Sequence, residues 1–169
     1  MHLRCSLFLF LFLAACASSA SPPPLGNSDA SVPRTDAGYE APPLDAGGLT
    51  DAGATFTRDF EGVCPQGKIA VWHFFDFQTH TPGDSSLVFR ARSATTQAGL
   101  DAAKSVDLAT VTGPDITAWT GVDVDARLAT IGQKSQRFLR LSITFASASD
   151  GTAPVLVAFR QQYDCVLGQ

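Results

Sequence analysis

The chain has 169 residues, with 12 Lys and Arg against 16 Asp and Glu, and a net charge of −4 at pH 7. Residues 56–169, enough for one small domain, hold ten basic and eleven acidic side chains and are nearly neutral. A domain that binds nucleic acid usually has an excess of basic over acidic side chains. This charge balance therefore excludes nucleic acid as a partner.

The N-terminus has the parts of a secretory signal peptide. Arg4 supplies positive charge, residues 7–13 are an unbroken run of Leu and Phe, and two small alanines follow at 14 and 15. The apolar run is much shorter than the roughly 20 residues that span a bilayer as a helix. We therefore expect residues 1–15 to be a signal peptide that is removed during export.

The sequence LAAC, residues 13–16, ends this apolar run and resembles the lipobox of bacterial lipoproteins. In that family the cysteine becomes the first mature residue and carries acyl chains on its sulfur and its amine. Each buried CH₂ contributes about 0.8 kcal/mol, so several chains anchor a protein firmly. The resemblance implies lipidation at Cys16. Ala17, in place of Asp, implies the outer membrane, with the domain facing the periplasm or the cell exterior. The alternative is an ordinary signal peptide cleaved near Ala20.

Residues 16–55 are predicted to form a disordered tether between the lipid and the domain. Three prolines at 22–24 favour polyproline II, and Asp-Ala-Gly recurs at 36–38, 45–47 and 51–53. Large apolar side chains are scarce, so burial cannot offset the entropy of ordering the segment. One basic and five acidic residues give a net charge of −4, which favours an extended chain. A calcium-binding repeat is the alternative, although its carboxylates would be sparse and irregularly spaced.

Residues 56–169 have the strand periodicity of a β-sandwich. Residues 69–77 are β-branched and aromatic with apolar side chains on both faces, as in a strand buried between layers. A Pro-Gly-Asp turn at 82–84 leads to a second alternating segment, 86–92, and we expect these two strands to form a hairpin. Two further strands are predicted at 137–145 and 155–163. Several strands separated by polar turns predict an all-β, antiparallel β-sandwich.

The middle of the domain has a weaker pattern. Residues 95–107 contain several alanines and are consistent with one helical turn or with a loop. Residues 117–131 hold short apolar alternations. The sequence contains no long amphipathic helix that would argue against an all-β fold.

Cys64 and Cys165 remain once Cys5 has left with the signal peptide and Cys16 has been lipidated. Disulfides persist outside the cytosol, and two cysteines are too few ligands for a zinc site. We therefore expect Cys64 and Cys165 to pair. The bond would close a loop of about 100 residues and make the first and last strands of the domain neighbours.

The stretch from Trp72 through residues 77–92, with FLRL at 138–141 and YDC at 163–165, resembles a jelly-roll module of secreted bacterial proteins. The Asp-Ala-Gly tether is similar to those of lipoproteins from myxobacteria, which carry many such modules. The resemblance implies a jelly-roll-like sandwich and an envelope location. It implies no catalytic residues, because its motifs are structural.

Trp119 is the strongest candidate for ligand contact, because it lies in the polar, loop-like stretch GPDITAWTG at 113–121. Sugar-binding jelly rolls stack a pyranose on an exposed aromatic ring and fix its hydroxyls with polar side chains. Asp115 is the predicted polar partner. The alternative is that Trp119 closes the end of the sandwich as a core residue, as we expect of Trp72.

The remaining reactive side chains suggest no metal, cofactor or catalytic site. His73 and Asp76 are three residues apart, so a regular strand places them on opposite faces, and zinc requires more convergent ligands. His80, Asp84 and Ser85 are the residue types of a hydrolase triad, but the sequence has no nucleophile elbow. We therefore expect no enzymatic activity.

These features predict a lipid-anchored cell-envelope protein with a non-catalytic binding module, and carbohydrate or cell-wall material is the expected ligand. The alternative is a structural or protein-partner lipoprotein without a small ligand. A hydrolase is the third reading. The tether favours a binding role, because a mobile leash lets a small domain search for partners near the membrane.

Overall fold

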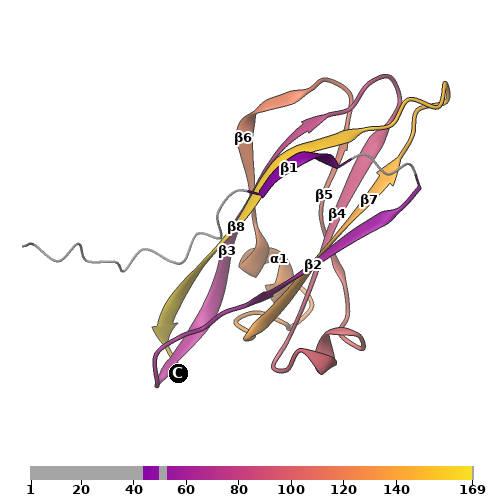
Figure 1. Cartoon of the computed structure of the whole chain (residues 1–169). Helices are drawn as coiled ribbons and strands as arrows, with labels where there is room; N and C mark the ends of the chain where they lie inside the picture. The colour runs from indigo at the N-terminus through magenta and orange to yellow at the C-terminus, as the bar shows by residue number, and fades with distance from the viewer. Residues whose placement is uncertain (1–43, 50–52, 169) are drawn as a thin grey trace, which may run out of the picture. The chain divides into compact units, whose positions relative to one another are not determined.

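The computed structural model describes residues 44–49 and 53–168, which belong to one compact unit, Arg34–Gln169. Within these residues the chain forms eight strands and two short helices (Figure 1). In chain order they are β1 (Leu44–Leu49), β2 (Thr55–Glu61), β3 (Lys68–His80), β4 (Ser86–Ala94), η1 (Ala98–Leu100), β5 (Val106–Thr112), β6 (Ile116–Asp123), α1 (Val124–Ala129), β7 (Phe138–Ala146) and β8 (Val155–Leu167). The signal peptide, Cys16 and the tether up to residue 43 lie outside the described residues.

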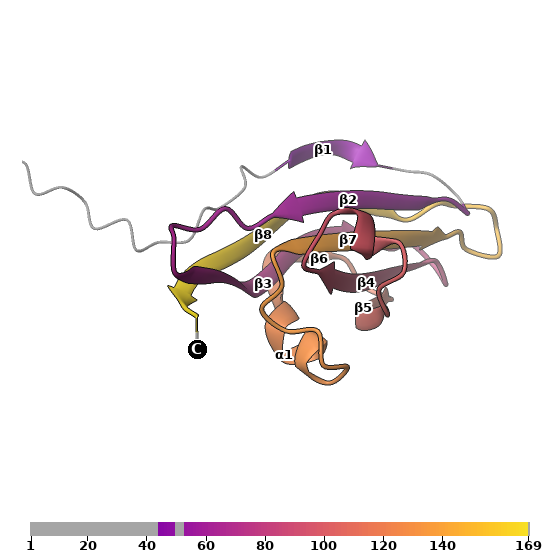
Figure 2. The same cartoon turned by 90° about the horizontal axis from the view of Figure 1, so that it is seen from below.

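The strands form two four-stranded antiparallel sheets that pack face to face (Figures 1 and 2). Sheet A has the order β1-β8-β3-β6, and sheet B has the order β2-β7-β4-β5. The pairs β1–β8, β2–β7, β3–β6 and β4–β5 are nested one inside the next along the chain. This strand order is that of a jelly roll. The prediction of an antiparallel, jelly-roll-like β-sandwich is confirmed.

The core lies between the sheets and is filled by alternate side chains of the strands. The four inward residues of β7, as predicted, are at most 1% exposed: Leu139, Leu141, Ile143 and Phe145. Trp72 on β3 is fully buried, and its Nε1 donates to the carbonyl of Gln136 at 2.8 Å. Trp72 is therefore a core residue, as expected, and its polar atom is satisfied.

The predicted hairpin between residues 69–77 and 86–92 is wrong. These segments are β3 in sheet A and β4 in sheet B, so they lie in opposite layers. The rings of Phe77 and Phe89 stack across the core with their centroids 4.5 Å apart. The two strands thus pack through their side chains instead of sharing backbone hydrogen bonds, and the Pro-Gly-Asp turn links two sheets.

The sandwich begins before Phe56. β1 lies within residues 16–55, the predicted tether, and pairs with β8 at the edge of sheet A. Strand pairing uses backbone N–H and C=O groups, which every residue except proline supplies. A composition poor in apolar side chains therefore did not reveal this strand.

Short helices occupy the middle of the domain, where the sequence pattern was weak. η1 is a single turn within residues 95–107, in agreement with one of the two alternatives. α1 follows β6 directly, and the Asp123 side chain caps it by accepting from the amide of Ala126 at 3.0 Å. Its buried residues, Val124 and Leu128, join the core. The alternation at 117–131 therefore comprises one strand and one helix.

A β-bulge interrupts β3 beside β8. Trp72 pairs with Tyr163 but Phe75 pairs with Gln161, so β3 has one residue more than its partner in this interval. The inward positions change parity at the bulge, from Trp72 before it to Phe75 after it. Consequently the outer face of β3 does not follow the simple alternation predicted for residues 69–77.

The bulge also corrects the prediction that His73 and Asp76 face opposite sides. His73 Nε2 contacts Asp164 Oδ2 at 2.8 Å, and Asp76 Oδ2 accepts from Arg160 Nε at 2.8 Å. Asp164 and Arg160 are four residues apart on β8 and share one face of that strand. Both His73 and Asp76 therefore lie on the outer face of sheet A.

Cys64 and Cys165 form the predicted disulfide, with their Cα atoms 5.6 Å apart. Cys64 lies in the connection from β2 to β3, and Cys165 lies on β8. β3 pairs with β8 over most of its length. The expectation that the bond accompanies neighbouring first and last predicted strands is confirmed.

Candidate functional site

The outer faces of the two sheets differ in their exposed apolar side chains. Six of the seven large apolar residues that are exposed lie on strands of sheet A: Ile69, Phe74, Trp119, Val157, Val166 and Leu167. The seventh, Val63, lies in the β2–β3 connection. Within the described residues, sheet B carries none. A sheet that carries most of the exposed apolar side chains is the better candidate for contact with another molecule.

Trp119 lies on β6, the edge strand of sheet A, and is 40% exposed. It is therefore neither in a loop nor a core residue that closes the sandwich. The guanidinium carbon of Arg160 lies 4.7 Å from the centre of the Trp119 ring, in cation–π geometry. One face of the ring thus lies against Arg160, while 40% of the residue remains exposed.

Asp76 fixes the position of Arg160. Its carboxylate Oδ2 accepts from Arg160 Nε at 2.8 Å and from Gln162 Nε2 at 3.3 Å, and the residue is only 8% exposed. A carboxylate in so sheltered a place needs a charged partner and hydrogen bonds. The ion pair therefore orients the guanidinium, and the guanidinium in turn supports the ring of Trp119.

Gly121 packs closely against the second oxygen of Asp76 and the ring of Phe74. It pairs with Asp76 across β6 and β3. A Cβ at Gly121 would lie 2.4 Å from Asp76 Oδ1 and 3.2 Å from Phe74 Cδ1. The hydrogen bonds described for Asp76 reach Oδ2, whereas Oδ1 packs against Gly121. We name Phe74, Asp76, Trp119, Gly121 and Arg160 the Trp119 surface.

The Trp119 surface combines three chemical features. It combines a partly exposed aromatic ring, a sheltered carboxylate, and a guanidinium that this carboxylate holds in place. A ring with C–H groups on one face and hydroxyls at its rim would match this combination, because the apolar face stacks and the hydroxyls donate. The surface therefore has the properties of a site for a polyhydroxylated ring.

Asp115, the predicted partner of Trp119, lies just before β6. Its Oδ1 contacts His80 Nδ1 at 2.6 Å and accepts from the amide of Thr81 at 3.3 Å. The contacts described for Trp119 lead to Arg160 instead. Asp115 thus joins the end of β3 to the start of β6, and Asp76 is the carboxylate nearest in the contact network to the Trp119 ring.

The residues of the hypothetical triad have separate partners. His80 contacts Asp115 at 2.6 Å, whereas Asp84 Oδ1 accepts from the amide of Ser149 at 2.7 Å. Ser85 is fully buried, and its hydroxyl has no hydrogen-bond partner. The described geometry therefore does not assemble these three side chains into a Ser-His-Asp relay.

Residues 44–49 and 53–168 contain no cluster of three or more His, Cys, Asp or Glu side chains placed to hold a metal ion. No helix among them has the length and hydrophobicity needed to cross a membrane.

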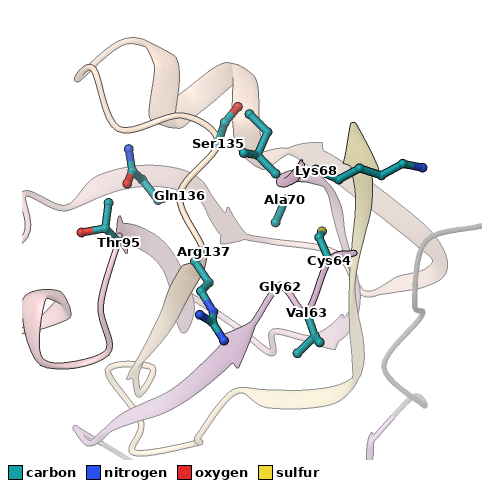
Figure 3. Close-up of a pocket in the computed structure, with 10 residues that line it drawn as sticks. Gly62, Val63, Cys64, Lys68, Ala70, Thr95, Ser135, Gln136 and Arg137 are labelled. Atoms are coloured by element: carbon teal, nitrogen blue, oxygen red, sulfur yellow. The ribbon is translucent and has the colours of Figure 1, made fainter. Parts of the chain in front are cut away.

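A cavity of about 410 Å³ lies beside the disulfide, at the end of β3 away from Trp119. Residues 62–64 and 68–70 line it together with Thr95 and the loop before β7, residues 135–137. Figure 3 shows that the polar ends of Lys68, Thr95 and Gln136 point outward, not toward one another. Ligand sites need a few convergent polar groups, so this cavity is the weaker candidate.

The outer face of sheet B carries ion pairs. Arg140 donates to both oxygens of Asp59, at 2.6 and 2.8 Å, and also pairs with Asp101 at 2.5 Å. The hydrogen bond from Arg140 holds the pKa of Asp59 below its ordinary value of 3.8. The two carboxylates in turn raise the pKa of Arg140. Arg92 lies opposite Arg140 and donates to the carbonyls of Leu100 and Asp101.

Sequence reasoning found Trp119 but missed the other members of its surface. Asp76 and Phe74 were placed by a regular alternation that the bulge breaks. Arg160 lies more than 40 positions from Trp119 in the chain and reaches it only because β8 and β6 flank β3. The signal available beforehand was Gly121 within an apolar strand pattern, which marks a close approach.

Comparison of the sequence with models of protein families gives no match, and comparison with curated proteins likewise gives none.

Proposed function

We propose that this protein is a lipid-anchored, non-catalytic module of the cell envelope that binds carbohydrate through the Trp119 surface. The observation that carries the proposal is the partly exposed ring of Trp119, supported on one side by Arg160, which the sheltered carboxylate of Asp76 holds in place. An exposed aromatic ring held in one orientation contributes contact area at little cost in side-chain entropy.

The charges favour an uncharged sugar. Arg160 is already engaged by Asp76, so its charge is compensated before a ligand arrives. A second carboxylate, Asp164, lies on the same face of β8. An acidic sugar would meet these carboxylates and gain little from Arg160, whereas a neutral sugar can donate its hydroxyls to Asp76.

The anchor and the location rest on the sequence. LAAC at 13–16 supports lipidation at Cys16, and Ala17 supports sorting to the outer membrane. Cys16→Ser should release the protein from the membrane fraction or leave an uncleaved precursor. A membrane-bound variant that is processed normally would contradict the assignment of Cys16.

A protein partner is the second candidate, and the six exposed apolar residues of sheet A favour it. Protein contact surfaces are rich in such side chains and in aromatic residues. Crosslinking in the native envelope would identify a protein partner. A crosslink that maps to sheet A, with no glycan binding, would replace the carbohydrate proposal.

The test of carbohydrate binding is a screen of the purified full chain against neutral polysaccharides and cell-wall fractions. Trp119→Ala should weaken binding to a retained glycan about 30-fold, the effect of losing a central aromatic contact worth about 2 kcal/mol. Val157→Ala is the matched control, because Val157 is similarly exposed on sheet A but lies outside the Trp119 surface.

The melting temperature separates binding from folding. Trp119→Ala should leave it nearly unchanged, because most of the removed contact area faces solvent or Arg160. A fall of several degrees would show that the ring supports the fold. Absence of saturable, sugar-competed binding to any neutral glycan would overturn the proposal.

A further inference from the structure

The register between β3 and β6 breaks beside Trp119. Phe77 and Thr79 are two residues apart on β3. Their partners on β6, Thr120 and Ile116, are four residues apart. One residue of β3 therefore lies opposite three residues of β6, the last of which is Trp119. Such a β-bulge at the edge of a sheet serves to re-aim a side chain, so the bulge decides where the Trp119 ring is presented.

The residue of β3 that lies opposite this bulge is Gln78. A bulge disrupts the ladder of backbone hydrogen bonds, so groups within it need other partners. Gln78 Nε2 donates to the carbonyl oxygen of Thr117 at 2.7 Å. A side-chain amide thus takes the place of a backbone donor and ties the first residue of the bulge to β3.

Gln78 lies on the same outer face as the pair of Asp76 and Arg160. The residues before and after Gln78 are each 1% exposed, so the alternation of β3 turns Gln78 outward, as it does Asp76 two positions earlier. Trp119 is therefore constrained twice from β3. Asp76 holds Arg160 against the ring, and Gln78 holds the backbone two residues before the ring.

The side chains of the bulge do little to fix its position. Residues 117–121 of β6 are all exposed. The register of a strand is strongly specified only where one face of the strand is buried. In this stretch the hydrogen bond from Gln78 supplies a constraint that burial does not, and it selects one form of the bulge.

We propose that Gln78 is a positioning residue for the Trp119 surface. By holding the carbonyl of Thr117, it fixes the β6 bulge in the form that lays the Trp119 ring against Arg160. A ring that is already ordered loses less entropy when a ligand binds. The expected gain in glycan affinity rests on the proposed carbohydrate function, whereas the position of the ring is measurable without any glycan.

The test compares the unmodified full chain with Gln78→Met, which removes the amide donor and keeps the length of the side chain. Acrylamide quenching of tryptophan fluorescence reports on Trp119, because Trp72, the other tryptophan, is fully buried. Quenching should increase, and the indole N–H resonance of Trp119 should shift, as the ring leaves Arg160. Affinity for a retained neutral glycan should fall about fivefold, the effect of ordering one side chain on binding.

Three further variants serve as controls. Gln78→Lys keeps an N–H donor at a similar reach and should restore both the quenching and the affinity. Gln136→Met should change neither, although Gln136 Nε2 also donates to a backbone carbonyl, that of Lys134 at 3.4 Å. Each variant should melt within a few degrees of the unmodified protein, because it loses at most one exposed hydrogen bond. Gln78→Glu has the same shape and no donor when ionised, and it replaces Gln78→Met if that variant does not fold.

Measuring the ring separates this proposal from the carbohydrate function. If Gln78→Met matches the unmodified protein in quenching and in the indole resonance, Gln78 does not position Trp119 and the inference is wrong, whatever happens to the affinity. Increased quenching that Gln78→Lys reverses supports the positioning role. If that result is found in a protein that binds no neutral glycan, the positioning role stands and the carbohydrate function fails.

Discussion

The two sheets bury equivalent inner faces but present different chemistry to their surroundings. Sheet A exposes aromatic and aliphatic side chains around a sheltered ion pair, whereas sheet B displays a network of arginines and aspartates near solvent. A fold needs only the inner faces for its core. The difference between the outer faces therefore favours sheet A as the side of the proposed ligand site.

Both sheets hold a sheltered ion pair, since Arg140 and Asp59 on sheet B are 20% and 27% exposed, but the pairs that Asp76 and Asp107 form differ in depth. The side chains of Asp76 and Arg160 on sheet A are 12% and 28% exposed, whereas those of Asp107 and Arg90 on sheet B are 69% and 53% exposed. Exposed pairs contribute little because water screens them. A sheltered pair outside the core is costly to form, and its use here is to hold Arg160 in place.

The largest expected effect concerns the Cys64–Cys165 disulfide, which connects the two sheets. The disulfide joins β8 of sheet A to the connection that leaves β2 of sheet B. Replacing Cys64 and Cys165 with Ser should lower the free energy of unfolding by about 4–5 kcal/mol, from the entropy of a loop of about 100 residues. Denaturant unfolding of the oxidised protein and the double variant measures it. A loss below about 1 kcal/mol would show that strand pairing alone joins these ends.

The next effect separates the two faces with one matched substitution. Asp76→Asn and Asp107→Asn each remove the carboxylate from an Arg–Asp pair, on sheet A and sheet B respectively. Asp76→Asn should cost about 2 kcal/mol, since hydrogen bonds to charged groups are worth more when sheltered. Asp107→Asn should cost at most about 1 kcal/mol. Equal losses in chemical denaturation would contradict the difference in depth.

A smaller effect is the pH dependence of sheet B. Because Arg140 lowers the pKa of Asp59 in the folded state, the pair contributes its full stability above pH 3.8. That contribution is lost as the pH falls below 3.8 through the lower folded pKa. The unmodified protein should exceed Asp59→Asn in unfolding free energy by about 1 kcal/mol at neutral pH, and the difference should vanish in acid.

A pH titration of both proteins in denaturant measures this difference. A constant difference between neutral and strongly acidic pH would show that the Asp59 side chain stabilises sheet B by packing and not by its charge. Glycan binding should be the same in both proteins at neutral pH, because Asp59 lies on the other sheet from Trp119.

The strands with regular alternation of buried and accessible side chains could be predicted from the sequence. β7 and β8 were predicted because their side chains alternate between a buried and an accessible face, and the disulfide followed from the compartment and the cysteine count. The alternation pattern does not say which of the two sheets a strand belongs to. The wrong hairpin arose because two consecutive strands with apolar faces can either pair or pack, and only the tertiary fold decides.

The candidate site was likewise only partly predictable from the sequence. The polar neighbours of Trp119 made it a candidate for ligand contact but left a core position open, and its partner was sought within the same stretch, at Asp115. The structure brings Arg160 and Asp76 to Trp119 from two other strands, and one of them follows a bulge. An extra residue in one strand has no signature in single-sequence periodicity, so neither partner was identified.

The smallest effect on stability concerns Gly121, and its sign is informative. Glycine within a strand is less stable than alanine by about 0.5–1 kcal/mol, so an open position would gain that amount in Gly121→Ala. Here the added Cβ would lie 2.4 Å from Asp76 Oδ1 and displace the carboxylate from Arg160. We therefore expect a net change near zero or a slight loss, together with loss of glycan binding. A gain of about 0.5–1 kcal/mol with intact binding would show that Asp76 moves aside freely, and that its close contact with Gly121 does not shape the Trp119 surface.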